Sequence, residues 1–120
     1  FVYRLGQLVF ILQRGVRFPQ GPPFMSFFVY MILSKHKDRY VSYVGYTNNI
    51  RNRILLHNSS KGAKFTKGKI WKLIYLKKYQ NKVDAMKNEY KLKKNYKLKK
   101  KIKLNYIKDE KKKDIHNLTL

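Results

Sequence analysis

Five polar side chains that lie far apart in the sequence could together bind and hydrolyse a phosphate ester. They are Tyr30, Tyr43, Arg53, His57 and Glu89. This reaction needs a nucleophilic water, positive charge beside the transition state, and help for the departing oxygen. A guanidinium offers a planar fork that fits phosphate, an imidazole exchanges protons near neutral pH, and a carboxylate can hold a hard divalent cation. These residue types are the ones that metal-assisted hydrolysis of a phosphodiester would use.

The carboxylate of Glu89 has both a catalytic and a structural interpretation. It is nearly the only acid available, because Asp38 falls in a predicted turn and half of the acids fall in the lysine-rich C-terminal segment. A metal held by one carboxylate supplies Lewis acidity and can activate a bound water. The structural alternative is a surface helix residue that pairs with Lys93, four positions further on.

Arg53 and His57 lie four residues apart in IRNRILLHN, so on a helix they project from one face. A cation aimed in advance at developing charge accelerates a reaction on the order of 10²–10³-fold. Arg51 is the weaker candidate, because it points about 160° away around a helix. The structural alternatives are a solvated arginine and a histidine that packs or caps carbonyls at the helix end.

Tyr30 and Tyr43 both fall in predicted strands. A phenol has a pKa of about 10, so a tyrosine general base must be perturbed by a nearby metal and arginine, or must relay a proton through water. Both hydroxyls could instead orient water and phosphate, or simply lie at the rim of the sheet. Gly45, two residues after Tyr43, is expected to let the strand turn sharply and bring the tyrosine to the end of the sheet.

The elements that position these residues follow one another as β-β-α-β-α. Apolar and β-branched runs predict three strands, and capping residues with helical spacing of Ile50, Ile54 and Leu55 predict helices. The predicted ranges are strand 27–34, loop 35–39, strand 40–46, a helix capped by Thr47 or Asn48 and ending near Asn58, strand 70–79, and a second helix opened by Asn81 or Asp84. We expect an α+β fold, in which a small three-stranded antiparallel sheet is flanked by helices, with a basic helical C-terminal extension.

The composition excludes several classes of function. The chain of 120 residues has room for one domain. It contains no cysteine, which excludes disulfide partners and thiolate chemistry and fits a reducing cytoplasm. No apolar run approaches the ~18 residues of a membrane span. The net charge of +23 indicates nucleic acid as the partner, although a lysine-rich coding bias could also contribute. Nothing indicates the oligomeric state.

Three segments differ in composition. Residues 1–24 contain three arginines and no lysine, and they end in a proline-rich break before Met25. We expect them to be a non-native or disordered N-terminal extension, and the natural protein to begin at Met25. The expected functional domain covers residues 25–97, and residues 98–120 form a lysine-rich C-terminal tail.

The segment from Phe27 to about Lys97 resembles the GIY-YIG nuclease domain. VYM (residues 29–31) and YVG (residues 43–45) stand in the places of the two short family motifs, and AMKNEYKLKK carries the family glutamate. HNSSKGAKFTKGK and WKLIY resemble the compact single-domain branch of the family. The first motif departs from the family pattern in its flanking residues but retains the central tyrosine.

The resemblance assigns roles to the five residues. It implies that one tyrosine is the general base and the other a hydrogen-bonding aid, without indicating which. It implies that Arg53 holds the scissile phosphate, that His57 lies near the attacking water, and that Glu89 binds one divalent cation, Mg²⁺ or Mn²⁺. Tyr46 stands where relatives often have lysine, and is a candidate phosphate contact.

A glycine-bearing loop follows the first helix and is expected to contact the sugar-phosphate backbone without reading bases. Its candidate residues are Lys61, Lys64, Lys67 and Lys69. Phe65 and Trp71 could stack on bases, although Trp71 falls in a strand and is more typical of a core. An ordinary solvated loop is the alternative.

The sequence thus predicts a metal-dependent endonuclease that hydrolyses DNA phosphodiesters, with a role in repair or recombination. A non-catalytic nucleic-acid-binding module is the alternative. A ribosome-associated basic protein is a third interpretation.

Overall fold

The computed structural model describes the backbone of residues 26–118 and the side chains of residues 26–112. The elements are β1 (Phe27–His36), β2 (Arg39–Thr47), α2 (Ile50–Asn58), a short 3₁₀ helix η1 (Lys64–Thr66), β3 (Lys72–Tyr79), α3 (Lys82–Lys94) and α4 (Tyr96–Leu118). The predicted N-terminal extension, residues 1–24, lies outside the described residues.

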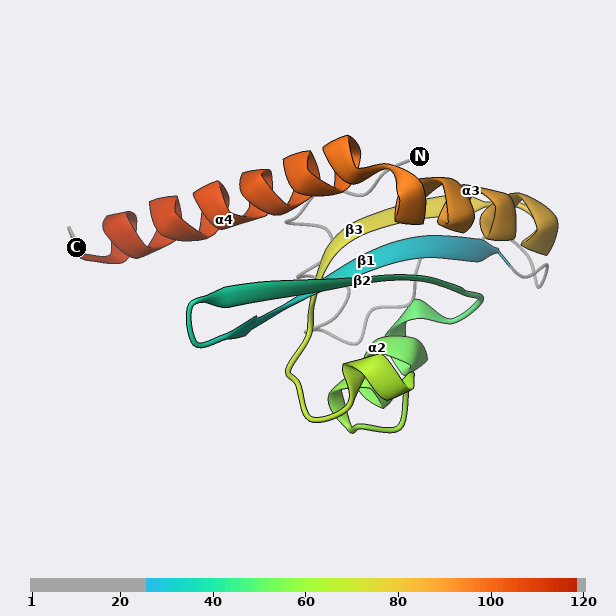
Figure 1. Cartoon of the computed structure of the whole chain (residues 1–120), viewed down its shortest axis with the longest axis horizontal. Helices are drawn as coiled ribbons and strands as arrows, with labels where there is room; N and C mark the ends of the chain where they lie inside the picture. The colour runs from blue at the N-terminus through green and yellow to red at the C-terminus, as the bar shows by residue number, and fades with distance from the viewer. Residues whose placement is uncertain (1–25, 119–120) are drawn as a thin grey trace.

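The three strands form one antiparallel sheet in the order β2-β1-β3, with β1 at its centre (Figure 1). In the β1–β2 ladder, Tyr30 lies opposite Gly45 and Ile32 lies opposite Tyr43. Because residues two apart on a strand share a face, Tyr30 and Tyr43 lie diagonally on the same face. The predicted α+β fold with a three-stranded antiparallel sheet and flanking helices is confirmed.

Helices cover both faces of the sheet. Alternate residues of β1, Tyr30 and Ile32 among them, pack in a cluster with α2. The intervening residues, including Val29 and Met31, pack in a second cluster with α3 and α4. Because both of its faces are buried, β1 has a continuous apolar run in place of the alternation of a half-exposed strand. Figure 1 shows α2 on one side of the sheet and α3 with α4 on the other.

Helix α2 begins later than the sequence suggested. Its N-cap is Asn49, whose side-chain oxygen accepts a hydrogen bond from the backbone nitrogen of Asn52 at 3.1 Å. The prediction of Thr47 or Asn48 was therefore wrong. Thr47 Oγ1 accepts a hydrogen bond from the backbone nitrogen of Asn49 at 3.1 Å and so supports the turn before the cap.

The buried face of α2 also differs from the predicted one. Ile50, Ile54 and His57 are buried, whereas Leu55 is 63% exposed. The expectation that Leu55 joins the apolar stripe was wrong, because a polar residue fills the inward position one turn beyond Ile54. A buried histidine needs hydrogen-bond partners, and these partners define the site described below.

The β1–β2 hairpin is tighter than the predicted loop of residues 35–39. His36 pairs with Arg39, which leaves Lys37 and Asp38 as the turn. Lys37 adopts a φ of 55° to reverse the chain. Both strands thus extend past the core with exposed polar residues.

The lysine-rich C-terminal segment forms the long helix α4, separated from α3 by Asn95. Ile102 and Tyr106 pack against the second core cluster, while most of the lysines are exposed. Residues 98–120, expected as a separate tail, thus begin inside α4. Within the described part of the chain, no helix combines the length and apolar character needed to cross a membrane.

Candidate active site

A chain of hydrogen bonds links β1, α2 and η1 in the interior of the protein. The Tyr30 hydroxyl lies 2.7 Å from His57 Nε2, and Arg53 Nε donates to the same hydroxyl at 3.3 Å. On the other side of the imidazole, His57 Nδ1 lies 2.9 Å from Thr66 Oγ1. Arg53 and His57 therefore do project from one face of α2, as their spacing predicts.

Thr66, at one end of this chain of hydrogen bonds, determines which atom donates in each bond. Thr66 donates its single hydroxyl hydrogen to the Ala63 carbonyl at 2.8 Å, so its oxygen must accept the hydrogen on His57 Nδ1. A neutral imidazole that donates through Nδ1 accepts through Nε2. The Tyr30 hydroxyl therefore donates to His57, and its oxygen accepts from Arg53.

Burial sets the protonation of this network. Tyr30 and His57 are both fully buried. Burial raises the pKa of Tyr30 to about 12, although the hydrogen bond and the charge of Arg53 act against the rise. Burial, and then the charge of Arg53, lowers the pKa of His57 to about 4. At neutral pH the phenol is protonated and the imidazole is neutral, in agreement with the bond directions.

Two glycines make room for the network. A Cβ atom at Gly45 would lie 2.5 Å from the Tyr30 hydroxyl oxygen, and one at Gly62 would lie 2.5 Å from His57 Nδ1. Gly45 lies within β2 and pairs with Tyr30. The expected sharp turn at Gly45 was wrong, because this glycine is needed for the close approach of a side chain.

Tyr43 forms the more exposed wall of the site. Its ring centroid lies 5.1 Å from that of His57 and 6.4 Å from that of Tyr30, and the residue is only partly buried. Hydrogen bonding first to Tyr30 and also to Tyr43 raises the pKa of Arg53. Arg53 thus donates to the Tyr30 hydroxyl, interacts with Tyr43, and remains charged.

Aromatic contacts continue from Tyr43 to the loop. Its ring stacks on Phe65, with centroids 6.3 Å apart and planes at 22°, and Phe65 is 52% exposed. Trp71 is buried and donates from Nε1 to the Thr66 carbonyl at 2.9 Å. Trp71 is thus a core residue that is hydrogen-bonded to η1, whereas the ring of Phe65 is accessible to solvent.

Glu89 approaches from the other layer of the fold. Asn81 caps α3, and Ala85 and Leu92, on the same helical stripe as Glu89, are buried against the sheet. The Glu89 side chain is therefore turned inward and is only 13% exposed. Its carboxylate contributes to the raised pKa of Tyr30, after burial as the main cause.

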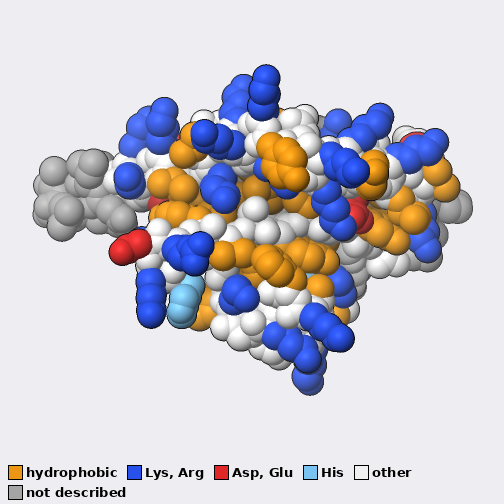
Figure 2. All heavy atoms as spheres, in the orientation of Figure 1, with side chains coloured by type: hydrophobic (Ala, Val, Ile, Leu, Met, Phe, Trp, Pro, Cys, Tyr) orange, Lys and Arg blue, Asp and Glu red, His pale blue; other side chains and the backbone are white. Residues whose placement is uncertain are grey.

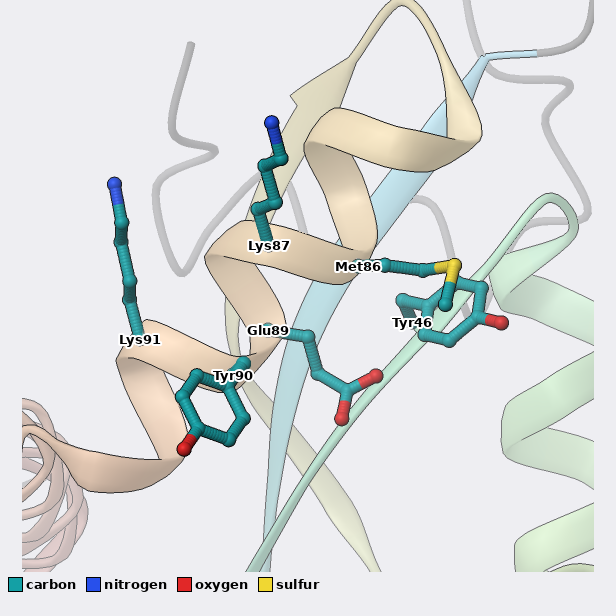
Figure 3. A pocket seen from close by; sticks show the side chains of 6 residues that line it. All are labelled: Tyr46, Met86, Lys87, Glu89, Tyr90 and Lys91. Carbon is teal, nitrogen blue, oxygen red and sulfur yellow. The ribbon is translucent and has the colours of Figure 1, made fainter.

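The carboxylate of Glu89 points across a hollow of about 570 Å³ toward β2 and Tyr46 (Figure 3). Its direct polar partner is Lys93, with Oε1 and Nζ 2.5 Å apart. The structural alternative considered for Glu89, a pair with Lys93, is thus present in this state of the protein. Four of the five candidate residues contact one another, whereas Glu89 comes from the other layer of the fold and lines a separate hollow.

Among the described residues, no group of three or more histidine, cysteine or acidic side chains could hold a metal ion. An all-protein site with many ligands is therefore absent from this region. A single inward carboxylate fits a hard cation that keeps most of its water ligands and takes others from a phosphate. The donor set around Glu89 is thus compatible with Mg²⁺ or Mn²⁺.

The basic loop residues lie on the surface. Lys61, Lys64 and Lys67 are exposed, and Lys69 donates to the Phe65 carbonyl at 3.2 Å with its ammonium 5.4 Å from the Phe65 ring centroid. Figure 2 shows lysine and arginine side chains distributed over the visible face, with few acids between them. Tyr46 lines the same hollow as Glu89.

Sequence reasoning missed two residues of the network, Thr66 and Gly62. Thr66 lies in a loop where a threonine gives no periodic signal, and Gly62 resembles an ordinary turn glycine. Their roles follow from the buried position of His57, since Thr66 binds its Nδ1 and Gly62 leaves room for its ring.

The chain is similar to several known bacterial proteins. The chain is 40% identical over 65 residues to a UPF0213 protein of Oceanobacillus iheyensis, a match that covers 53% of this chain and 74% of the relative. UPF0213 proteins of Clostridium perfringens and Staphylococcus haemolyticus are each 42% identical over 65 residues, again over 53% of this chain and over 69% and 78% of the relatives. These names state no activity. No solved structure matches the chain. The GIY-YIG catalytic domain model matches residues 26–103, and the chain therefore belongs to the GIY-YIG nuclease family.

Proposed function

We propose that this protein is a metal-dependent endonuclease that hydrolyses phosphodiester bonds of DNA. The observation that carries the proposal is the fixed position of Arg53, whose Nε is bound to a buried phenol while its fork reaches the partly exposed Tyr43. An arginine held in this way is aimed before the substrate arrives, which is how preorganised charge lowers a barrier.

Arg53 binds the scissile phosphate in this proposal. Its bond to Tyr30 uses Nε, which leaves the terminal nitrogens of the guanidinium for Tyr43 and for phosphate oxygens. The buried chain of Tyr30, His57 and Thr66 positions Arg53 and resists its displacement. The loop lysines and Tyr46 hold the backbone on either side of the cleaved bond.

Glu89 would hold the divalent cation, which when bound supplies Lewis acidity and lowers the pKa of coordinated water. Tyr43, the more exposed phenol, orients the attacking water and the phosphate. Tyr30 moves a proton only in concert with His57, because its hydroxyl hydrogen is already directed at His57 Nε2. We therefore assign Tyr43 to the reacting water, and Tyr30 with His57 to positioning and proton relay.

The test is a nicking assay on supercoiled plasmid and on labelled hairpin, flap, nicked and single-stranded DNA, with Mg²⁺ or Mn²⁺. We expect Glu89→Gln to reduce cleavage by at least about 10²-fold, while DNA binding measured without metal changes little. Asp109→Asn, which removes an exposed acid on α4, is the matched control. Unchanged cleavage by Glu89→Gln would refute the metal role of this residue.

The ion pair between Glu89 and Lys93 favours a second candidate function, a nucleic-acid-binding module that does not cleave. In such a protein the pair is permanent. Binding to every substrate of the panel, without cleavage at any Mn²⁺ concentration, would favour this candidate. A role in DNA repair or recombination and a cytoplasmic location belong to the proposal as predictions from the sequence.

A further inference from the structure

Glu89 and Lys93 form the one salt bridge among the residues whose side chains the structure describes, although lysines greatly outnumber acids in the chain. The two partners differ in their surroundings. The Glu89 side chain is 13% exposed, whereas the Lys93 side chain is 49% exposed. The carboxylate is therefore held in place by the fold, and the ammonium is the partner that is free to leave.

The ammonium occupies the position that a cation would need. Lys93 Nζ lies 2.5 Å from Glu89 Oε1, and Mg²⁺ would bind the same oxygen at about 2.0–2.1 Å. The two cannot share that oxygen, and their charges repel each other. We propose that Lys93 is an internal counter-ion that occupies Glu89 until a divalent cation displaces it, an inference that rests on the metal role proposed above for Glu89.

The arrangement also explains why a lysine lies there. A carboxylate that is mostly withdrawn from water is costly without a compensating charge. Lys93 supplies that charge from one turn further along α3, on a flexible stem that is half in solvent. When the cation binds, the ammonium can swing out with little loss of burial, and it then lies beside the site as a contact for substrate phosphate.

Other lysines of α3 provide matched controls. Lys91 lines the far rim of the same hollow and points away from Glu89 (Figure 3). Removing its charge alters the net charge of the protein by the same amount as removing that of Lys93. If Lys93 competes directly with the cation for Glu89, removing its charge must change the affinity for the cation more than removing the charge of Lys91. If only the net charge of the protein matters, the two variants must behave alike.

The experiment is a titration of the full chain with Mn²⁺ in the absence of nucleic acid, with free Mn²⁺ measured by electron paramagnetic resonance. We expect Lys93→Met to lower the Kd for Mn²⁺ about two- to fivefold, the range of a partly exposed ion pair. Lys91→Met changes the Kd by less than about 1.5-fold at physiological salt, because its charge is screened. Lys93→Arg keeps the competition and leaves the Kd near that of the unmodified protein.

Glu89→Gln separates this inference from the proposed function. If Glu89→Gln loses Mn²⁺ binding but Lys93→Met binds like the unmodified protein, the counter-ion inference is overturned and the metal role stands. If Glu89→Gln binds Mn²⁺ unchanged, both fail. Thermal unfolding verifies the fold of each variant, and Lys93→Gln replaces Lys93→Met if the latter does not fold. In cleavage, Lys93→Met should lower the half-saturating Mn²⁺ concentration by the same factor as the Kd.

Discussion

The hydroxyl of Tyr30 lies directly against Gly45, its partner across the β1–β2 ladder, so that a Cβ at position 45 would come within 2.5 Å of the hydroxyl oxygen and 2.7 Å of Cζ. Gly45→Ala must displace the buried ring. We expect a loss of about 1–3 kcal/mol in the free energy of unfolding, measured by urea denaturation. At Gly68 nothing lies within 4 Å of an added Cβ, and its φ of 75° is one that asparagine adopts more readily than other L residues, so Gly68→Asn is a control with a smaller loss. Equal stability of Gly45→Ala and the unmodified protein would show that the ring moves without cost.

The two tyrosines should respond differently to loss of their hydroxyls. Tyr30→Phe leaves His57 Nε2 without its donor in a buried site, which costs about 1–3 kcal/mol of stability. Tyr43→Phe removes a partly exposed hydroxyl and should stay within about 0.5 kcal/mol. Both variants should cut DNA more slowly. Denaturation and cleavage assays on the same preparations separate the roles, and a Tyr43→Phe protein with full activity would contradict the assignment of Tyr43 to the reacting water.

Thr66→Val tests the direction of the hydrogen-bond chain. The valine has similar shape but cannot accept from His57 Nδ1, so we expect a loss of about 1–3 kcal/mol in the free energy of unfolding. Thr66→Ser retains the hydroxyl and should keep most of the stability. Nitrogen chemical shifts of the imidazole report its tautomer directly. A protonated Nε2 in the unmodified protein would reverse the bond directions inferred above.

The stability of the protein should fall in acid because of His57. Its pKa is about 4 in the folded protein, below the ordinary value of 6.5, so the unfolded chain binds more protons between these values. The contribution is fully present above about pH 6.5 and is lost as the pH falls toward 4. It amounts to about 3 kcal/mol.

The measurement is urea denaturation at several pH values between 4 and 7. His57→Gln should remove most of the slope over this window. His36→Gln, at an exposed histidine of the hairpin, should keep it. A slope that survives in His57→Gln would assign the acid sensitivity to other groups.

Arg53→Lys retains a positive charge but loses the planar fork and the Nε donor to Tyr30. We expect cleavage to slow on the order of 10²–10³-fold, with a smaller change in DNA affinity. Arg51→Lys, on the exposed side of α2, should remain active. Single-turnover cleavage rates and filter binding provide the two readouts. Similar rates for Arg53→Lys and Arg51→Lys would remove the special role of Arg53.

The sequence predicted the order of the main strands and helices and the antiparallel character of the sheet because the local signals were strong. β1 is a long apolar run, Asn81 is one of the two caps that the sequence offered for α3, and the spacing of Arg53 and His57 defines one face of a helix. The cap of α2 was less certain because Thr47, Asn48 and Asn49 are all able to cap. Only the packing of Ile50 and Ile54 decides among them.

Burial of polar residues was the least predictable part of the site. Leu55 is the more apolar residue, yet His57 takes the interior position because Tyr30 and Thr66 satisfy both of its nitrogens. These partners come from β1 and η1, which are distant in the chain, so no local pattern reveals them. The reason for Gly45 was likewise hidden, because it depends on a neighbour across the sheet.

Arg53 and Glu89 belong to helices on opposite sides of the sheet, and the helix with the acid follows the last strand. A nascent chain that has been synthesised only as far as β3 contains Arg53, Tyr30 and Tyr43 but not yet Glu89. A nascent chain therefore cannot assemble the complete constellation, and cutting ability would be acquired only once α3 has emerged and docked. If the protein cleaves DNA as proposed, the fold delays that activity until α3 has been synthesised.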